Sequence, residues 1–287
     1  MIHEIPLERA TLHGHFSRDL PPIVEGDPGD SIAFSCPNAG WRLNDGKVFE
    51  PRDETLDQGH ALIGPIAVRG AEEGKTLVVQ IDEVRPGTFG ETFGRGTRIE
   101  WALDAAGGIG TDDRGASVEL APFLGVIGMP PSEDGVHSTG PPRRCGGNID
   151  CKELVAGTTL YIPISVDGAH VSAGDGHAAQ GDGELSGTAI ECYVERAQLT
   201  FELSELELSS PIARVGDTWL AFGFDEDLDL AAEEAIGTML DVMEREHGFD
   251  RSYAIALGSV AVDLRVTQIV NGVKGVHAVL RDGAFDA

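Results

Sequence analysis

The stretch AQLTFELSELEL, residues 197–208, alternates apolar and polar side chains and indicates a β-strand with one buried face. Leu199, Phe201 and Leu203 lie on that face, and a one-residue slip after Ser204 predicts a β-bulge. Short β-type runs separated by glycine and proline fill the chain upstream, at residues 31–35, 63–68, 76–84, 97–103, 159–166 and 188–195. Many short strands with turn signals between them predict a mainly β protein with a β-sandwich or barrel-like body.

The pattern changes after residue 208. Residues 228–247 carry apolar side chains at helical spacing and predict an amphipathic helix, and a second short helix is expected to begin at Asp250. Strands are expected at residues 219–224, 260–270 and 275–280. We therefore expect a β-rich body over residues 1–208 and a smaller α+β subdomain over residues 209–287, packed on that body.

The overall charge excludes some classes of partner. The 287 residues include 48 acidic and 21 basic side chains, which gives a formal net charge of −27 and argues against a protein that binds nucleic acid or an anionic membrane. No apolar run is long enough for a membrane helix, and the first residues lack the apolar stretch of a signal peptide. We expect a cytoplasmic protein whose four cysteines are reduced structural thiols.

One short run holds the residue types of a catalytic triad. Cys151, Lys152 and Glu153 are the types found in nitrilase-type amidases, but neighbouring side chains diverge on both a strand and a helix. We therefore expect that these three residues do not converge on one substrate carbonyl.

The segment GDGHAAQGDGE, residues 174–184, concentrates polar side chains between glycines. In an extended backbone, Asp175 and His177 share a face, and a carboxylate beside an imidazole suits a divalent metal. Glu184 can reach the same pocket after one turn. A polar glycine loop in which these side chains only cap turns is an equally open interpretation. Upstream, Asn148 and Asp150 either point toward this loop or form an Asx turn.

These segments resemble the acetamidase/formamidase family of amide hydrolases. The resemblance is carried by GPIAVRGAEEGKTLVVQI (64–81), by the block from GGNIDCKEL to GDGELSGTAIE (146–191), by VDLRVTQIVNGVKGVHAVL (262–280) and by HGHFSRDLPPIVEGDPGDSIAF (13–34). Together they span almost the whole chain.

The resemblance implies a cytoplasmic hydrolase that cleaves short carboxamides to ammonia and an acid, and that forms a homodimer or a larger homo-oligomer. It also implies a divalent metal, with Zn²⁺ favoured and Ca²⁺ or Mn²⁺ as alternatives. On this basis we assign His60, Asp175 and His177 as metal ligands and Glu184 as general base and then acid. Asp150 is assigned as a further catalytic residue, acting as a ligand or orienting one, and substrate binding is assigned to Asn148, His170 and Gln180.

Two positions depart from the family pattern. Lys75 stands where many members have aspartate, and Asn38 lies in a segment where many members have an aspartate. Two alternatives also stay open: a hydrolase of a lactam or larger amide on the same scaffold, because the sequence does not fix the pocket size, and a non-catalytic β-protein that binds a metal or small ligand through the same loop.

Overall fold

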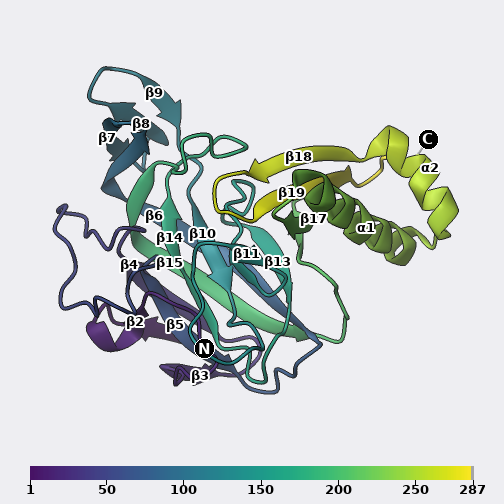
Figure 1. Ribbon diagram of the computed structural model, residues 1–287, viewed down its shortest axis with the longest axis horizontal. Helices are drawn as coiled ribbons and strands as arrows, with labels where there is room; N and C mark the ends of the chain where they lie inside the picture. Colours follow the sequence, from purple (N-terminus) through teal and green to yellow (C-terminus); the bar gives the residue numbers. More distant parts are fainter. Residues whose placement is uncertain (286–287) are drawn as a thin grey trace.

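The computed structural model describes residues 1–285, and it shows a mainly β body with an α+β part at the C-terminus (Figure 1). This confirms the predicted fold class. The body fills the left and centre of Figure 1, and the two C-terminal helices lie together at the right. Among the described residues, no helix has both the length and the apolar character needed to cross a membrane.

The body consists of strands and one short 3-10 helix. Its elements are β1 (Ile2–Ile5), η1 (Arg9–Thr11), β2 (Leu12–His13), β3 (Val24–Gly26), β4 (Ser31–Cys36), β5 (Leu62–Val68), β6 (Thr76–Gly94), β7 (Thr97–Asp104), β8 (Ile109–Asp112), β9 (Ser117–Glu119), β10 (Phe123–Gly128), β11 (Pro142–Arg143), β12 (Gly146–Asn148), β13 (Thr158–Pro163), β14 (Val171–His177) and β15 (Glu191–Ser204).

The C-terminal part follows in chain order: β16 (Ile212–Val215), β17 (Thr218–Asp225), α1 (Leu228–His247), α2 (Arg251–Ala261), β18 (Asp263–Gln268) and β19 (Lys274–Arg281).

The two longest strands, β6 and β15, pair antiparallel through the middle of the body. The predicted buried face of β15 is present, because Leu199 and Phe201 are at most 3% exposed. The predicted bulge after Ser204 is wrong, since β15 ends at that residue. Its irregularities lie earlier, where the pairing with β6 shifts between Cys192 and Leu199. Residues 188–195 and 197–208 were expected as two strands, but they contribute to one strand because β6 supplies a continuous partner.

The C-terminal strands continue the hydrogen-bonded sheet of the body. β13 pairs with β6 and β16, β16 with β17, β17 with β19, and β19 with β18. Backbone hydrogen bonds between β13 and β16 thus connect the part before residue 208 to the part after it. The division at residues 208 and 209 stays a prediction, and residues 286 and 287 of the second part lie outside the described residues.

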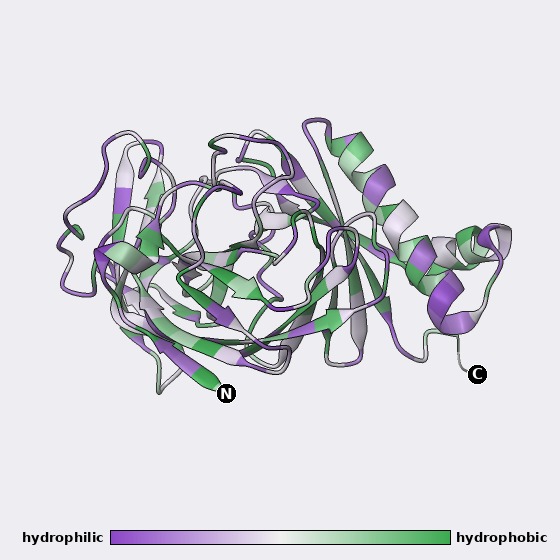
Figure 2. Ribbon diagram, turned by 90° about the horizontal axis from the view of Figure 1, so that it is seen from below, coloured by the Kyte–Doolittle hydropathy of each residue, from purple (hydrophilic) through white to green (hydrophobic). Residues whose placement is uncertain are grey.

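Helix α1 covers one face of β17 and β19 (Figure 2, where the helix carries both hydrophobic and hydrophilic residues). It begins where the sequence predicts, because the Asp227 carboxylate accepts hydrogen bonds from the backbone N–H groups of Asp229 and Leu230. It ends at Gly248, whose φ of 69° is the left-handed conformation that glycine adopts readily. Glycine is also needed at position 223, where a Cβ would lie 2.1 Å from the Ala231 carbonyl oxygen. The helix backbone can therefore approach the sheet closely.

The second helix begins after Asp250 as predicted, but it is longer than expected. Because α2 runs to Ala261, the expected strand at residues 260–270 is shortened to β18, Asp263–Gln268. The last strand, expected at residues 275–280, is present as β19.

Candidate active site

Strand β14 brings Asp175 and His177 to one place, as their two-residue spacing predicts. Both side chains are buried, with His177 at 1% exposure. The glycines before and between them are required by close packing, because a Cβ at Gly174 would lie 2.3 Å from the Ala61 carbonyl oxygen and a Cβ at Gly176 would lie 2.3 Å from Val194 Cγ2. The GDGH sequence is therefore what allows a strand to carry two functional side chains between tightly packed neighbours.

Asp150 reaches the same place from a different segment. It follows β12, which pairs with β10, and its backbone N–H donates to the Gly125 carbonyl oxygen at 3.2 Å. Ligand atoms of Asp150, Asp175 and His177 all lie within 4.8 Å of one another. A Cβ at Gly125 would lie 2.4 Å from Asp175 Oδ2 and 2.7 Å from Asp150 Oδ1. Gly125 therefore forms the floor of a cradle that these two carboxylates border.

The His177 ring lies at the centre of a group of acids. Its Nε2 is 3.4 Å from both Asp175 Oδ1 and Glu191 Oε1, and its Nδ1 is 3.9 Å from Asp150 Oδ1. Glu191 occupies this position because β14 and β15 pair at His177 and Glu191. The sequence did not predict a role for Glu191.

Many buried polar atoms here have no hydrogen-bond partner among the described residues. Buried polar groups in native proteins are nearly always paired, so such a concentration at one point requires an explanation. The atoms concerned are Asn148 Oδ1, Asp150 Oδ1, Asp175 Oδ1, both ring nitrogens of His177, Glu184 Oε2 and Glu191 Oε2.

Three of these residues have a backbone conformation that L-residues rarely adopt. The φ angles are 53° at Asp150, 62° at Asp175 and 47° at Glu184. Each such conformation costs about 1 kcal/mol or more and is retained where the surrounding structure enforces it. Because strained residues cluster at functional sites, their convergence here supports a functional rather than a turn-capping role for this segment.

Burial and mutual charge shift the pKa of each group. Burial, together with the nearby Glu184, raises the pKa of Asp150 well above its ordinary value. Burial opposes ionisation of Asp175 as well, but His177 and His60 outweigh it and hold the Asp175 pKa at about 2. Burial, opposed by His177 and reinforced by Asp175, raises the pKa of Glu184 to about 7. Burial disfavours charge on His177, yet Glu191 and Asp175 raise its pKa well above the ordinary value.

The group opens into a cleft of about 460 Å³. Six of the eight site residues assigned from the sequence line it: His60, Asn148, Asp150, Asp175, His177 and Glu184. Residues that the sequence did not point to also line it, among them Glu91, Glu191 and Asn271. Asn271 donates from Nδ2 to Asp150 Oδ2 at 2.6 Å and so fixes that carboxylate.

Glu91 forms the outer acidic wall of the cleft. It is buried, and its Oε2 accepts from Arg98 Nε at 2.9 Å while its Oε1 lies 3.3 Å from Arg42 Nε. Two guanidinium groups thus balance the charge of Glu91. No lysine or arginine among the described residues forms an ion pair with Asp150, Asp175, Glu184 or Glu191.

His60 borders the cleft from the far side of Asp175. Its Nε2 is 4.0 Å from Asp175 Oδ2, and its Nδ1 lies 2.8 Å from Thr139 Oγ1, which fixes the ring. The atoms that lie close enough together to share one metal ion belong to Asp150, Asp175 and His177. His60 is not part of this three-residue group, but it lies next to it and can contact a ligand bound in the cleft.

The other two assigned residues lie outside the lining of this cleft. Gln180 donates from Nε2 to the Asp150 backbone carbonyl at 2.8 Å, so it holds the segment that carries Asp150. His170 lies just before β14, with φ 53°, next to Gly168.

The two departures from the family pattern have different surroundings. Lys75 lies near the surface and pairs with Glu72 and Glu205. Asn38 lies in the cleft wall, where its Oδ1 accepts from the Arg42 backbone N–H and its Nδ2 is 3.5 Å from Glu91 Oε1. Only the second departure can affect what the cleft binds.

The residues fit a divalent cation. Asp150, Asp175, Glu184 and Glu191 surround one imidazole, and buried charges need a compensating partner. Two carboxylates and an imidazole border the cradle above Gly125, and this donor set suits a borderline or hard divalent metal. The group can therefore hold a metal ion.

Comparison with known proteins identifies the family of the chain. The model of the Acetamidase/Formamidase family matches residues 3–113 and 132–280. The chain belongs to the acetamidase/formamidase family. Among curated proteins, the formamidase of Methylophilus methylotrophus is 27% identical over 246 residues, which cover 61% of this chain and 60% of that protein. The acetamidase of Mycolicibacterium smegmatis is 26% identical over 248 residues, which cover 61% of each protein.

This member of the acetamidase/formamidase family thus aligns with about three fifths of the length of those two relatives. Among solved structures, an acetamidase from Bacillus halodurans superposes with a TM-score of 0.86 at 26% identity, covering 100% of this chain and 99% of that one. The family resemblance inferred from the GGNID and GDGHAAQGDGE segments is confirmed.

Proposed function

We propose that this protein hydrolyses short carboxamides of the formamide or acetamide type to ammonia and a carboxylic acid. The observation that carries the proposal is the buried group of Asp150, Asp175 and His177, which lines the same cleft as Glu184. Asp150 Oδ1, Asp175 Oδ1 and both ring nitrogens of His177 have no hydrogen-bond partner within residues 1–285. Family membership supports the same reaction class.

We assign Asp150, Asp175 and His177 as the residues that hold a divalent metal, with His60 as an additional ligand. Zn²⁺ is favoured, and Mn²⁺ or Ca²⁺ are the alternatives that the oxygen donors permit. When bound, such an ion supplies Lewis acidity, which polarises an amide carbonyl and makes water more acidic. Asn271 keeps Asp150 in place through its hydrogen bond to Oδ2.

Glu184 is the general base and then the general acid in this proposal. Its Oε2 has no partner among the described residues, and the side chain is only 5% exposed. Glu184 Oε2 takes a proton from the attacking water molecule while the water oxygen bonds to the carbonyl carbon of the amide. It then delivers a proton to the amide nitrogen as the C–N bond breaks.

Asn148 is the residue that we propose to orient the substrate. Its Nδ2 is committed to the Gly140 carbonyl oxygen at 2.9 Å, while its buried Oδ1 has no partner in the described part of the chain. An oxygen acceptor of this kind matches the N–H donors of a primary amide. We expect Asn148→Ala to raise KM for primary amides more than it lowers kcat.

Ammonia release from a panel of amides tests the proposed reaction. Formamide, acetamide, longer amides and lactams are offered to the wild-type protein and to His177→Ala, with Asp182→Asn as a control outside the cleft. Release of ammonia from the short amides by the wild type and the control, but not by His177→Ala, is the expected result. Ring opening of lactams alone assigns the lactam alternative. No turnover of any amide or lactam, together with retained metal binding, assigns the non-catalytic alternative.

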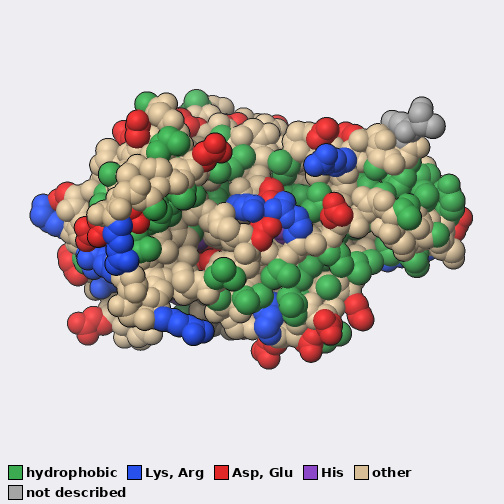
Figure 3. Space-filling model, turned by 90° about the horizontal axis from the view of Figure 1, so that it is seen from above, with side chains coloured by type: hydrophobic (Ala, Val, Ile, Leu, Met, Phe, Trp, Pro, Cys, Tyr) green, Lys and Arg blue, Asp and Glu red, His purple; other side chains and the backbone are tan. Residues whose placement is uncertain are grey.

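We also propose a homo-oligomer and a cytoplasmic location. Apolar side chains are exposed near the C-terminal helices, at the right-hand end of Figure 3, with Tyr253, Ile255 and Val260 between 52% and 83% exposed. A surface of this kind supports association between copies of a chain. The four cysteines are buried free thiols, which supports a reducing compartment. Light scattering and cell fractionation test the two proposals.

A further inference from the structure

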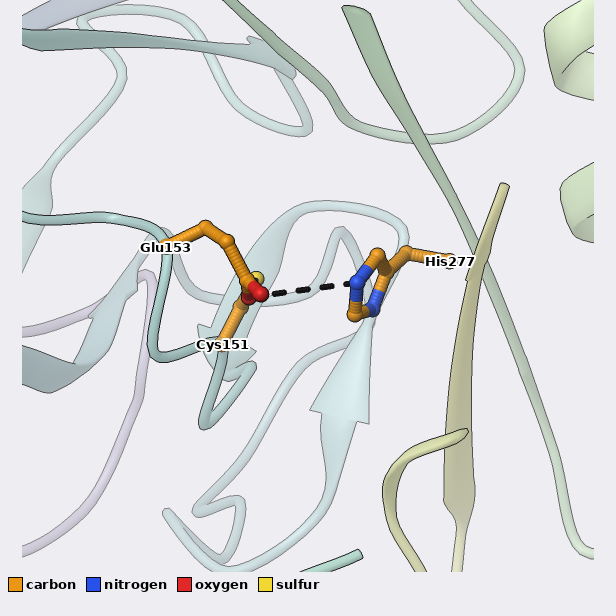
Figure 4. A group of neighbouring side chains, drawn as sticks. All are labelled: Cys151, Glu153 and His277. Carbon is orange, nitrogen blue, oxygen red and sulfur yellow. Dashed lines mark hydrogen bonds and ion pairs between the residues drawn. The ribbon is translucent and has the colours of Figure 1, made fainter. Parts of the chain in front are cut away.

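A second group of potential metal ligands lies outside the lining of the cleft and joins the body to the last strand. Cys151 and Glu153 come from the turn after β12, and His277 comes from β19 (Figure 4). Cys151 Sγ is 3.2 Å from Glu153 Oε2, and His277 Nε2 is 3.8 Å from the same oxygen. Ligand atoms of the three residues all lie within 4.8 Å of one another.

As expected, Cys151, Lys152 and Glu153 do not converge on one point, because only Cys151 and Glu153 meet. The backbone turns after Cys151, and Cys151 and Glu153, which are two residues apart, lie on the same side of that turn. Lys152 points elsewhere and pairs with Asp182. The third member, His277, is 126 positions after Cys151 and could not be placed from the local sequence.

The histidine of this group has one ring nitrogen without a partner. His277 is fully buried, and its Nδ1 lies 2.8 Å from Thr267 Oγ1, which fixes the orientation of the ring. Its Nε2 faces Glu153 and has no hydrogen-bond partner within residues 1–285. A buried nitrogen held in this way is costly unless something binds it.

The Glu153 carboxylate is also held in an orientation that suits metal binding. Glu153 Oε1 accepts from Arg265 Nη1 at 2.5 Å, which leaves Oε2 directed toward Cys151 and His277. Metal-binding side chains are commonly oriented by such outer hydrogen bonds. Arg265 and Thr267 supply these bonds from the neighbouring strand β18.

We propose that Cys151, Glu153 and His277 form a second, structural site for a thiolate-preferring divalent metal of the zinc class. Sulfur, nitrogen and carboxylate oxygen are the donors that Zn²⁺ combines in proteins. Binding replaces the Cys151 S–H proton by the metal and releases that proton to solvent. Because Cys151 is 1% exposed and His277 is 0% exposed, the site is closed to substrates, and it ties the body to β19.

Cobalt substitution tests this proposal independently of any amidase activity. The stripped protein is titrated with Co²⁺, because a thiolate ligand gives an intense near-ultraviolet charge-transfer band that oxygen and nitrogen ligands do not give. The variants are Cys151→Ser and His277→Gln. The matched control is Cys145→Ser, because Cys145 is also a buried thiol and donates only to the Met129 carbonyl oxygen.

We expect the wild type and Cys145→Ser to show the band and Cys151→Ser to lose it. Circular dichroism confirms that each variant is folded. We also expect zinc content, measured by mass spectrometry, to fall by one equivalent in Cys151→Ser and His277→Gln. Absence of the band in the wild type, or its retention in Cys151→Ser, would overturn the proposal, and neither result bears on the proposed amide hydrolysis.

Discussion

Substituting Gly125 by alanine is the sharpest steric perturbation of the proposed metal site. Gly125 lies on β10 below the carboxylates of Asp150 and Asp175. The added methyl group would lie 2.4 Å from Asp175 Oδ2, 2.7 Å from Asp150 Oδ1 and 3.0 Å from His177 Cε1. It would thus contact every residue of the group at once, without changing any charge.

The size of the effect follows from these distances. Real Cβ atoms essentially never approach other atoms closer than 3.0 Å, so Asp175 Oδ2 must move by at least 0.6 Å, the difference between 3.0 and 2.4 Å. Metal–ligand distances tolerate only about 0.2 Å, and a displacement of about 1 Å in an active site costs about 100-fold in rate. We therefore expect Gly125→Ala to lose about 100-fold in kcat/KM and most of its metal affinity. Overpacking of this kind destabilises the fold by about 1–3 kcal/mol.

The assay measures ammonia release and bound metal in the same preparations, with circular dichroism as the test of folding. Gly181→Ala is the control, because Gly181 lies in the QGDGE segment and a Cβ there meets nothing within 4 Å. We expect this control to behave as the wild type. If folded Gly125→Ala keeps its bound metal and full turnover, the cradle above Gly125 does not hold the metal.

Three further predictions follow from single residues. Glu184→Gln should lower kcat by about 10²- to 10⁴-fold while bound metal, measured by mass spectrometry, is retained; unchanged kcat would remove the base from the mechanism. Burial lowers the pKa of His13 from 6.5 to about 4. Between pH 6.5 and pH 4 the unfolded chain therefore binds a proton that the folded chain does not. As the pH falls through this range, the free energy of unfolding decreases by about 3 kcal/mol. Urea denaturation at several pH values should show a smaller loss in His13→Gln, and an equal loss in both proteins would contradict this. Lys75→Asp should change stability by about 1 kcal/mol or less and leave ammonia release within about twofold, since Lys75 forms only surface ion pairs; a large loss of turnover would show that this departure matters.

Local patterns predicted those parts of the fold and site that depend on neighbours in the sequence. Alternation in residues 197–208 predicted the buried face of β15, and the helical spacing of apolar side chains over residues 228–247 predicted both ends of α1. The two-residue spacing of Asp175 and His177 predicted that they share a face of a strand, and Figure 1 shows that strand, β14, within the body.

The remaining features depend on long-range pairing. Glu91 and Glu191 are opposite each other in the pairing of β6 with β15, a contact between residues 100 positions apart that no local pattern indicates. Asn271 donates to Asp150 across 121 positions of the sequence, and Gly183 is hydrogen-bonded to Thr267 of β18 and to Ile269 just after it. The family resemblance identified Asp150 and Glu184 as site residues, but their strained backbone became apparent only in the structure.

The most direct test of the central claim is a metal titration followed by ammonia release. Protein stripped by a chelator is supplied with increasing amounts of Zn²⁺, Mn²⁺ or Ca²⁺, and turnover of formamide and acetamide is measured at each step for the wild type and for Asp175→Asn. We predict that turnover is lost on stripping, returns with added metal in the wild type and does not return in Asp175→Asn. Undiminished turnover by protein verified to be free of metal would contradict the assignment of Asp150, Asp175 and His177 as a catalytic metal site.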